Sequence, residues 1–268
     1  MERSIAYSNE EPGDLNEMDG YNCPECLNRG FTWELEEQPP HIEGGEPVYS
    51  ERTRLCKCMS VRANIRRMKQ SGLEPIIKKC TFERYEATEE WQQVLKTAAI
   101  QFTKNVDDLE CKWFFMGGGV GSGKTHLCTA IAREMLYKGR EVRYMLWEAD
   151  GKKLKSIIND IEAYQNMIEP FKNAEVLYID DLFKPTRDKD GQIAQPTSGD
   201  IKLAYEIINH RYQKPNSITI ISSERHMSEI IELDNAVGSR IYEMTKQNAY
   251  NISKDADRNY RTRDMKVI

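Results

Sequence analysis

The stretch that decides the fold is Gly118-Gly119-Val120-Gly121-Ser122-Gly123-Lys124-Thr125. It satisfies G-x-x-x-x-G-K-[ST], follows the apolar run 113–116, and precedes apolar residues at helical spacing. A strand, a glycine loop and a helix in this order favour a phosphate site over an ordinary glycine turn, because the loop N–H groups and the helix N-terminus point at phosphate oxygens. We expect Lys124 to reach the β- and γ-phosphates of ATP and Thr125 to ligate Mg²⁺. The predicted nucleotide-binding residues are Gly118, Gly119, Val120, Gly121, Ser122, Gly123, Lys124, Thr125 and His126.

Composition limits the class of protein. The chain has 268 residues, seven cysteines and a net charge of −5, which predicts one large domain with a small appendage. No apolar run is long enough to span a bilayer, and the polar, acidic N-terminus is not a signal peptide. We therefore expect a cytoplasmic protein with no membrane partner, whose cysteines are reduced or metal-bound rather than disulfide-linked.

Charge is distributed unevenly. Residues 1–50 hold twelve acids and two bases, whereas seven bases and no acid lie between Arg52 and Lys69. Residues 1–20 are predicted to be a flexible acidic leader. Residues 60–70 are predicted to be a basic helix, with Val61 and Ile65 on one side and Arg62 elsewhere. The basic run favours either a solvated face or contact with nucleic acid or an acidic partner.

Two close cysteine pairs indicate a metal site. Cys23 and Cys26 are separated by 29 residues from the second pair, Cys56 and Cys58, and such pairs are typical of the two halves of a tetrahedral zinc site. The segment between them is poor in apolar residues, so a structural ion would supply what its core lacks. The redox interpretation needs a thioredoxin-like βαβ setting that this sequence does not provide. His41 could replace one cysteine, or could simply be solvated.

From residue 88 onward, helical stripes alternate with apolar strands. Strands are expected at 113–116, 142–146, 175–181 and 218–222, and one helical stripe at 154–161. Continuous apolar strands joined by helices imply a parallel sheet covered on both faces. The predicted fold class is therefore α/β, a P-loop NTPase three-layer sandwich preceded by a small zinc-binding module.

Polar residues follow the ends of these strands. In a parallel sheet, ligands bind where the strand C-termini meet, so Asp180 fits the role of holding Mg²⁺ and Asp181 that of orienting the attacking water. Ser222, Ser223 and Glu224 end the strand expected between those of the P-loop and Asp180; one of them could sense the γ-phosphate, or a serine could cap the next helix. Arg240 could act as an arginine finger on a neighbouring subunit's nucleotide, or be a plain surface arginine. Phe82 could touch an adenine, or only pack.

These motifs resemble the AAA+ ATPases of the bacterial helicase-loader type, in the DnaC/DnaI branch and particularly its phage-encoded members. The resemblance covers roughly residues 80–268 and is carried by the P-loop, by residues 178–184 (Tyr-Ile-Asp-Asp-Leu-Phe-Lys), by residues 220–223 (Ile-Ile-Ser-Ser) and by residues 239–241 (Ser-Arg-Ile). The Cys-rich N-terminus is similar to the zinc-binding, helicase-contacting module of DnaI-type loaders.

The resemblance implies an ATP-dependent protein that delivers a hexameric replicative helicase of the DnaB family onto single-stranded DNA during replication. It implies self-association through the ATP interface. It also implies that Lys152, Lys153 and Lys155 contact DNA; alternatively, these lysines only form the solvated first turn of a helix. Asp181 stands where many AAA+ proteins have Glu, which predicts slow, partner-stimulated ATP hydrolysis. Fewer than 30 residues follow Arg240, too few for the usual helical lid.

The expected domain limits are a leader at 1–20, a zinc-binding helicase-interaction module with its basic helix at 21–72, a linker at 73–86 and an AAA+ ATPase domain at 87–268. Two other functions fit the same fold. One is a transposition helper ATPase of the IstB type, against which the cysteine module argues. The other is a non-hydrolysing, zinc-dependent adaptor, against which Asp180, Asp181 and Arg240 argue.

Overall fold

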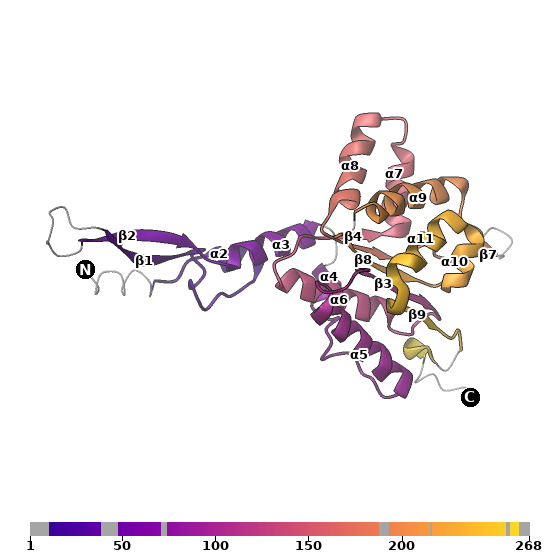
Figure 1. Cartoon of the computed structure of the whole chain (residues 1–268), viewed down its shortest axis with the longest axis horizontal. Coiled ribbons are helices and arrows are strands. Elements are labelled where there is room, and N and C mark those ends of the chain that lie inside the picture. Colours follow the sequence, from indigo (N-terminus) through magenta and orange to yellow (C-terminus); the bar gives the residue numbers. More distant parts are fainter. Residues whose placement is uncertain are drawn as a thin grey trace. The chain divides into compact units, whose positions relative to one another are not determined.

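The computed structural model describes residues 11–38, 48–70, 74–187, 193–214, 216–255 and 258–262. Its contacts divide the chain into two compact units, Met1–Arg66 and Arg67–Ile268 (Figure 1). His41, considered above as a zinc ligand, lies outside the described residues. The domain limits expected from the sequence remain predictions.

The first unit is built around a two-stranded antiparallel hairpin of β1 (Phe31–Gln38) and β2 (Val48–Leu55), which lies between the two cysteine pairs. Side chains alternate between its two faces. One face carries Phe31 and Trp33, whose rings meet edge to face, while the other carries the ion pairs Arg52–Glu36 and Arg54–Glu34. The alternation explains why a segment poor in apolar residues still forms strands.

Two helices complete this unit: α2 (Leu15–Asp19), within the predicted leader, and α3 (Cys58–Gln70), the predicted basic helix. The structure differs from the sequence expectation at Arg62, because this side chain is fully buried. Its guanidinium donates to Asp19 Oδ1 at 2.6 Å and to Asn28 Oδ1 at 2.8 Å. A buried charge needs such partners, so Arg62 links α3 to α2 and to the turn after Cys26.

The second unit contains a five-stranded parallel sheet in the order β4-β5-β8-β3-β9. The strands are β3 (Trp113–Gly118), β4 (Val142–Leu146), β5 (Val176–Asp180), β8 (Ile218–Ser223) and β9 (Ala249–Ile252). The predicted parallel sheet is confirmed, and β8 lies between β5 and β3 as expected. The short edge strand β9 had no counterpart in the sequence expectation.

Helices cover both faces of this sheet (Figure 1). One face is covered by α5 (Glu90–Asn105) and α6 (Lys124–Tyr137), with α4 (Glu74–Ile77) against α6. The other face packs against α7 (Trp147–Ser156), α8 (Ile161–Asn173), α9 (Ser198–Tyr212) and α11 (Asn235–Thr245), preceded by α10 (Met227–Leu233). A short hairpin, β6 (Thr186–Arg187) and β7 (Ile193–Ala194), follows β5. The described residues beyond α11 form η1 (Lys246–Asn248), β9 and η3 (Tyr260–Thr262).

Successive side chains of a strand point to opposite faces of the sheet, so each strand contributes to the core on both faces. Along β3, Phe114 contacts Phe102 of α5 on one face, while Phe115 joins the large apolar cluster on the other. The helical stripe expected at 154–161 is wrong, because the chain leaves α7 at Ser156 and starts a new helix at Ile161. Asp160 causes this break, since its carboxylate accepts the N–H of Ala163 at 3.0 Å and caps α8. None of the helices in the described ranges is both long and apolar enough to cross a lipid bilayer.

Candidate nucleotide site and cysteine cluster

The glycine-rich loop joins β3 to α6, so its backbone lies at the C-terminal edge of the sheet and at the N-terminus of a helix. Gly123 has φ 86°, and a Cβ there would lie 2.7 Å from the Tyr85 ring, so only glycine fits. Ser122 Oγ donates to the Gly119 carbonyl at 2.7 Å, a hydrogen bond within the loop that stabilises its conformation. Such a loop provides N–H donors and a partial positive charge for a phosphate.

Lys124, the first residue of α6, is almost completely buried. Its ammonium group donates to the carbonyl oxygens of Gly118 at 2.9 Å and Gly119 at 2.5 Å. Burial lowers the pKa of Lys124, although the nearby carboxylates of Glu224 and Asp181 oppose that effect. The predicted phosphate lysine is thus held over its own loop, where a polyphosphate would replace the two carbonyl oxygens as the stronger acceptor.

Asp180, the last residue of β5, is the centre of a hydroxyl network. Its Oδ1 accepts from Thr125 Oγ1 at 3.2 Å, Tyr178 OH at 2.7 Å and Ser222 Oγ, and its Oδ2 accepts from Tyr144 OH at 3.0 Å. Burial, and then the charge of Asp180, raise the pKa of Tyr144 and Tyr178, so both remain protonated donors. Thr125 and Asp180 are therefore in direct contact, as ligands of one Mg²⁺ site should be. The two tyrosines were not predicted, although Tyr178 lies two residues before Asp180 and so shares its face of the strand.

Asp181 begins a tight turn, and its backbone has φ 58°. Its carboxylate accepts from Lys184 Nζ at 2.6 Å, and the same ammonium group lies 3.8 Å from Glu224. The Asp181 hydrogen bond is the main reason that the pKa of Lys184 is raised. Asp181 and Glu224 line the cavity beside Lys124, but the carboxylate of Asp181 is engaged by a lysine in this state.

The two serines at the end of β8 have different partners. Ser222 Oγ accepts the N–H of Asp181 at 3.1 Å and donates to Asp180, so it connects the two aspartates. Ser223 Oγ donates to the Leu182 carbonyl at 2.7 Å and accepts the N–H of Arg225. Ser223 therefore holds the turn after β5, whereas Ser222 belongs to the network of Asp180. Of the three candidate sensors, Glu224 lines the cavity.

A cavity of about 470 Å³ extends from the P-loop. Its walls include residues that the sequence analysis missed. Among these are Ile76, Cys80, Arg84, Tyr85, Glu86, Gln92 and Tyr260. Arg261 also lines the cavity. Tyr85 lines it, and Phe82, the predicted adenine contact, does not. His126 of α6 contacts the segment that carries Tyr85, because its ring meets the Tyr85 ring edge to face and its Nε2 lies 2.8 Å from the Thr81 carbonyl oxygen. The cavity is large enough for a nucleotide, by the usual size of ligand sites.

Arg240 lies on α11, away from the residues that line this cavity. Its guanidinium lies over the rings of Tyr205, at 5.3 Å, and Tyr212, at 5.5 Å, and donates to the Ala236 carbonyl. Within one chain it therefore cannot serve the chain's own P-loop in this conformation. An arginine finger at this position would act on a neighbouring subunit.

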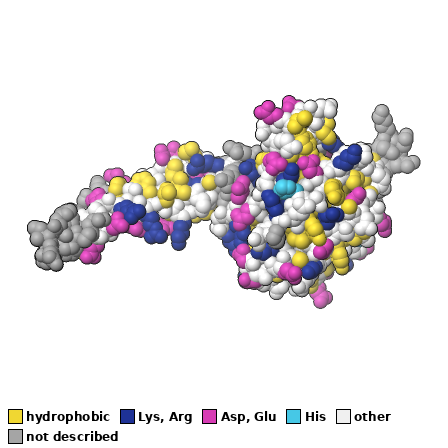
Figure 2. Space-filling view, turned by 45° about the horizontal axis from the view of Figure 1, so that its top comes forward, with side chains coloured by type: hydrophobic (Ala, Val, Ile, Leu, Met, Phe, Trp, Pro, Cys, Tyr) yellow, Lys and Arg dark blue, Asp and Glu magenta, His cyan; other side chains and the backbone are white. Residues whose placement is uncertain are grey.

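The three lysines predicted to bind DNA all lie on α7, in its last two turns and not at its start, because α7 begins at Trp147. Each faces a carboxylate: Lys152 is 2.8 Å from Glu148, Lys153 is 3.6 Å from Asp150, and Lys155 is 2.5 Å from Asp200. Lys152 and Lys153 remain highly exposed. Figure 2 likewise shows basic and acidic side chains interspersed on the visible face of the molecule. Their role in DNA binding stays a prediction.

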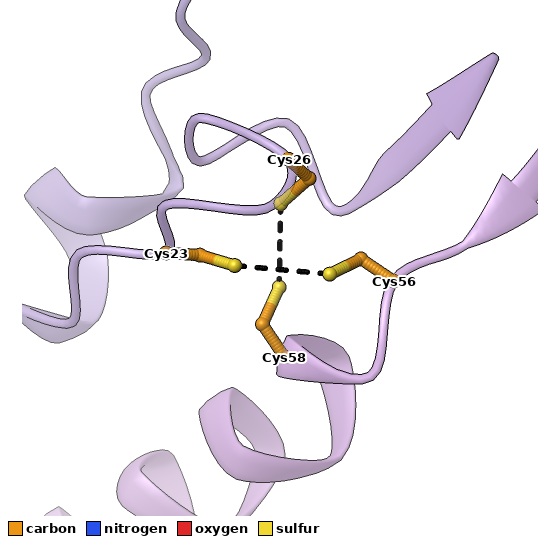
Figure 3. A group of neighbouring side chains, drawn as sticks. All are labelled: Cys23, Cys26, Cys56 and Cys58. Carbon is orange, nitrogen blue, oxygen red and sulfur yellow. Dashed lines mark hydrogen bonds between the residues drawn. The ribbon is translucent and has the colours of Figure 1, made fainter.

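The four predicted zinc ligands meet in the first unit (Figure 3). All four are buried thiols, with every sulfur within 4.8 Å of the others: Cys23, Cys26, Cys56 and Cys58. The Sγ atoms of Cys23 and Cys56 lie 3.7 Å apart, and those of Cys26 and Cys58 lie 3.5 Å apart. Tetrahedral Zn²⁺ with Zn–S bonds of about 2.3 Å places its sulfurs about 3.8 Å apart, so the donor set and its spacing fit zinc.

The surroundings favour a thiolate at Cys26, whereas burial raises the pKa of Cys56 and of Cys58. Burial opposes ionisation of Cys26, but the N–H of Gly30, 3.3 Å from its sulfur, and the neighbouring cysteines outweigh it and lower its pKa to about 7. N–H donors of this kind orient and stabilise metal-bound sulfur. All seven cysteines of the chain are free thiols in this structure.

The comparisons with known sequences agree with this geometry. The family described as bacterial DnaA ATPase domain matches residues 76–246. The phage-like element PBSX protein XkdC of Bacillus subtilis (strain 168) is 31% identical over 232 residues, which cover 84% of this chain and 79% of XkdC. The replicative helicase loader DnaC of Escherichia coli (strain K12) is 27% identical over 125 residues, which cover 46% of this chain and 51% of DnaC. The match to DnaC thus spans about half its length.

Solved structures share the fold. A crystal structure of the DnaC helicase loader superimposes with a TM-score of 0.51 at 20% identity, covering 67% of this chain and 98% of that one. Replication initiator DnaA bound to AMPPCP and single-stranded DNA also gives a TM-score of 0.51 at 20% identity, covering 67% of this chain and 50% of that one. At this identity the likeness concerns the fold alone.

Proposed function

Because the chain belongs to the DnaC-type branch of the AAA+ ATPases that share the bacterial DnaA ATPase domain, we propose that it is an ATP-dependent loader of a hexameric replicative helicase onto single-stranded DNA. The observation that carries the proposal is the juxtaposition of Lys124, Thr125 and Asp180 at one edge of the sheet, beside a cavity of about 470 Å³. A relative of the same branch, the DnaC of Escherichia coli, is a replicative helicase loader.

The residues of the ATPase unit have distinct parts in this proposal. The P-loop N–H groups and Lys124 bind the β- and γ-phosphates, while Thr125 and Asp180 hold the Mg²⁺ that neutralises them. Hydrolysis of the bound triphosphate supplies the free energy for switching between two states of the loader. Tyr144, Tyr178 and Ser222 fix the direction of the Asp180 carboxylate, since each donates a hydrogen bond to it.

The basal rate of hydrolysis is proposed to be low. A carboxylate that orients the attacking water must be free to accept a proton or a hydrogen bond from that water, and Asp181 accepts instead from Lys184 at 2.6 Å. Movement of the Lys184 side chain would release Asp181. The proposed trigger of this movement is binding of the helicase, of single-stranded DNA, or of a second copy of the chain, which would contribute Arg240.

The cysteine-rich unit is proposed to bind zinc and to contact the helicase. Four buried sulfurs at tetrahedral spacing support the metal. The neighbouring hairpin exposes Leu35, Tyr49 and Leu55, and exposed apolar side chains of this kind mark many protein–protein contacts. Lys152, Lys153 and Lys155 are the proposed contacts to the DNA backbone, which would make the affinity for DNA salt-dependent.

The experiment that tests this function uses the full chain, purified DnaB-family helicase from the same host, and a closed circle of single-stranded DNA. We expect ATP-dependent delivery of the helicase, measured as strand displacement from an annealed oligonucleotide, together with phosphate release that rises when helicase and DNA are both present. Asp180→Asn should abolish both signals. Lys214→Ala, far along the chain from the P-loop, should leave them unchanged.

Two results would contradict the proposal. If the helicase neither binds the chain nor is delivered, the loader function is wrong, and binding of a transposase instead would favour an IstB-type helper. If delivery proceeds equally with Asp180→Asn and without phosphate release, the chain is a non-hydrolysing adaptor.

A further inference from the structure

Arg240 of α11 is held by two aromatic rings of the neighbouring helix α9. Its guanidinium carbon lies 5.3 Å from the centre of the Tyr205 ring and 5.5 Å from the centre of the Tyr212 ring. The two tyrosines are seven positions apart, so they share one face of α9 and lie about 10.5 Å apart along its axis. This separation fits a guanidinium placed between the two rings, which we name the tyrosine clamp (Tyr205 and Tyr212).

The rings, more than hydrogen bonds, decide where this guanidinium lies. Its Nη1 donates to the Ala236 carbonyl at 2.7 Å, whereas its Nε is buried without a hydrogen-bond partner. Among the described residues, no carboxylate forms an ion pair with Arg240. A cation over the face of an aromatic ring is attracted by the ring quadrupole, and arginine is the cation most often found there. The clamp therefore supplies the main contacts of this charge.

The clamp is itself tied to the helix that carries Arg240. Tyr212 OH donates to Glu243 Oε2 at 3.0 Å, and Glu243 follows Arg240 by about one turn of α11. This hydrogen bond is the main reason that the pKa of Tyr212 is raised, so its hydroxyl remains a protonated donor. The Tyr205 ring is 40% exposed, so this side of the clamp lies at the surface of the ATPase unit.

A clamped guanidinium can still bind an anion. A cation–π contact uses none of its N–H donors, which lie at the edge of the planar group. In the described part of the chain Nη2 has no hydrogen-bond partner, and unlike Nε it is not buried. One edge of the guanidinium is thus free to form a charge-assisted hydrogen bond with a phosphate oxygen brought to it from outside.

We propose that the tyrosine clamp positions Arg240 for the phosphates of ATP bound to the P-loop of a second copy of the chain. This inference rests on the proposed function, which gives Arg240 the part of an arginine finger, and adds two positioning residues to it. A free arginine side chain populates many rotamers, and holding it in one removes that entropic cost from the transition state. Tyr205 and Tyr212 touch no nucleotide and act only through Arg240.

The test is steady-state ATP hydrolysis by the full chain with helicase and single-stranded DNA, using the double variant Tyr205→Leu/Tyr212→Leu. We expect kcat to fall about 10- to 30-fold, because the released side chain regains the rotamer freedom of arginine. The affinity of the chain for a fluorescent ATP analogue should not change, since its own P-loop is intact. Replacing both tyrosines by Phe should preserve kcat, because both rings remain.

Mixing of subunits separates positioning from a purely structural role. Lys124→Ala has an intact clamp and an intact Arg240, so adding it to the double Leu variant should restore part of the hydrolysis. The P-loop of the Leu variant then faces a positioned arginine from the other protein. Adding Arg240→Ala should not restore hydrolysis, because neither protein then supplies a positioned arginine.

The matched control is Tyr137→Leu. The Tyr137 ring is 45% exposed and also has a guanidinium over it, that of Arg133 at 4.5 Å, but it belongs to α6 and lies outside the lining of the cavity. This variant should hydrolyse ATP as the wild type does. Tyr205→Leu alone guards against misfolding of the double variant. It should melt at the wild-type temperature, because the ring is partly exposed, and still lower kcat.

The outcomes distinguish the inference from the function on which it rests. If Arg240→Ala abolishes hydrolysis while both Leu variants keep the wild-type kcat, the inference is overturned and the arginine finger stands. Restoration by Arg240→Ala as effective as that by Lys124→Ala, or restoration by neither, would also overturn the inference. If Arg240→Ala hydrolyses ATP as fast as wild type, or if wild type hydrolyses none, the proposed function is wrong and the inference falls with it.

Discussion

Removing the buried guanidinium of Arg62 should open the cysteine-rich unit. Arg62 and Asp19 have fully buried side chains and are joined at 2.6 Å. In Arg62→Met, the Asp19 carboxylate would keep only the N–H of Tyr21, 3.0 Å from Oδ1, and its Oδ2 already has no partner. Breaking a buried pair from one side costs about 3–5 kcal/mol, and Asn28 would lose a donor as well.

The assay is hydrogen exchange of the full, zinc-loaded chain, read by mass spectrometry on peptides from β1 and β2. In Arg62→Met, the free energy of opening for the amides hydrogen-bonded between β1 and β2 should fall by about 3–5 kcal/mol. If the wild-type free energy of opening is smaller than this loss, the protection of these amides should vanish. Amides of the ATPase unit should be unaffected, since Arg62 contacts residues of the first unit alone among those described.

The control is Arg52→Met on the same hairpin. Arg52 forms an ion pair with Glu36 at 2.9 Å, but its side chain is 69% exposed, and exposed pairs contribute about 0–1 kcal/mol. The free energy of opening could instead fall by less than about 1 kcal/mol in Arg62→Met, as in Arg52→Met. This result would refute the conclusion that the buried Arg62–Asp19 pair holds α2, α3 and the cysteine turns together.

Three further predictions concern the metal, the acid stability and the subunit interface. Cys58→Ser should lose most of the zinc that elemental analysis finds in wild type, whereas Cys111→Ser, outside the cluster, should keep it; equal zinc in both would remove the metal site. Burial opposes ionisation of Asp200, but its bonds to Lys155 and Thr197 outweigh it and lower its pKa. The carboxylate therefore stabilises the fold above the unfolded pKa of about 3.9, and this stability is lost as pH falls through the lower folded pKa. The gap in Tm between wild type and Asp200→Asn should thus narrow below about pH 4, and a constant gap would contradict the assignment. Finally, Arg240→Ala and Lys124→Ala should each abolish ATP hydrolysis. A mixture of the two proteins should restore part of it, because the intact P-loop of one variant can then face the intact Arg240 of the other. No restoration would place Arg240 outside the site.

Local patterns in the sequence predicted the ATPase unit well. The strands around the P-loop and Asp180 are runs of buried apolar residues, which is the pattern of a parallel sheet covered on both faces. The edge strand β9 gave no such signal, since it has four residues and forms only because β3 offers a free edge.

Features that depend on distant partners could not be predicted. Arg62 looked like one base among seven, and its burial depends on Asp19, 43 positions earlier in the chain. Lys155 looked like a DNA contact, but its partner Asp200 is 45 positions away. Tyr260 lines the cavity because its N–H donates to the carbonyl of Gly121, 139 positions earlier in the chain. Residue type and spacing indicate chemistry, whereas the pairing of charges is decided by the tertiary fold.

The hairpin between the cysteine pairs is an intermediate case. Its first strand alternates Phe31, Trp33 and Leu35 with polar residues, which is the period of a half-buried strand. The high content of Glu and Gly around it concealed that pattern, so the segment was expected to lack a core.

The central claim is that a triphosphate with Mg²⁺ is bound between the P-loop and Asp180. It is tested most directly by titrating a fluorescent ATP analogue into wild type and Lys124→Ala, with melting temperatures measured alongside. Wild type should bind in a Mg²⁺-dependent way, and Lys124→Ala should bind at least about 10- to 100-fold more weakly, because its ammonium group is the buried cation of the loop. Equal affinity for the two proteins, or binding that is indifferent to Mg²⁺, would contradict the account.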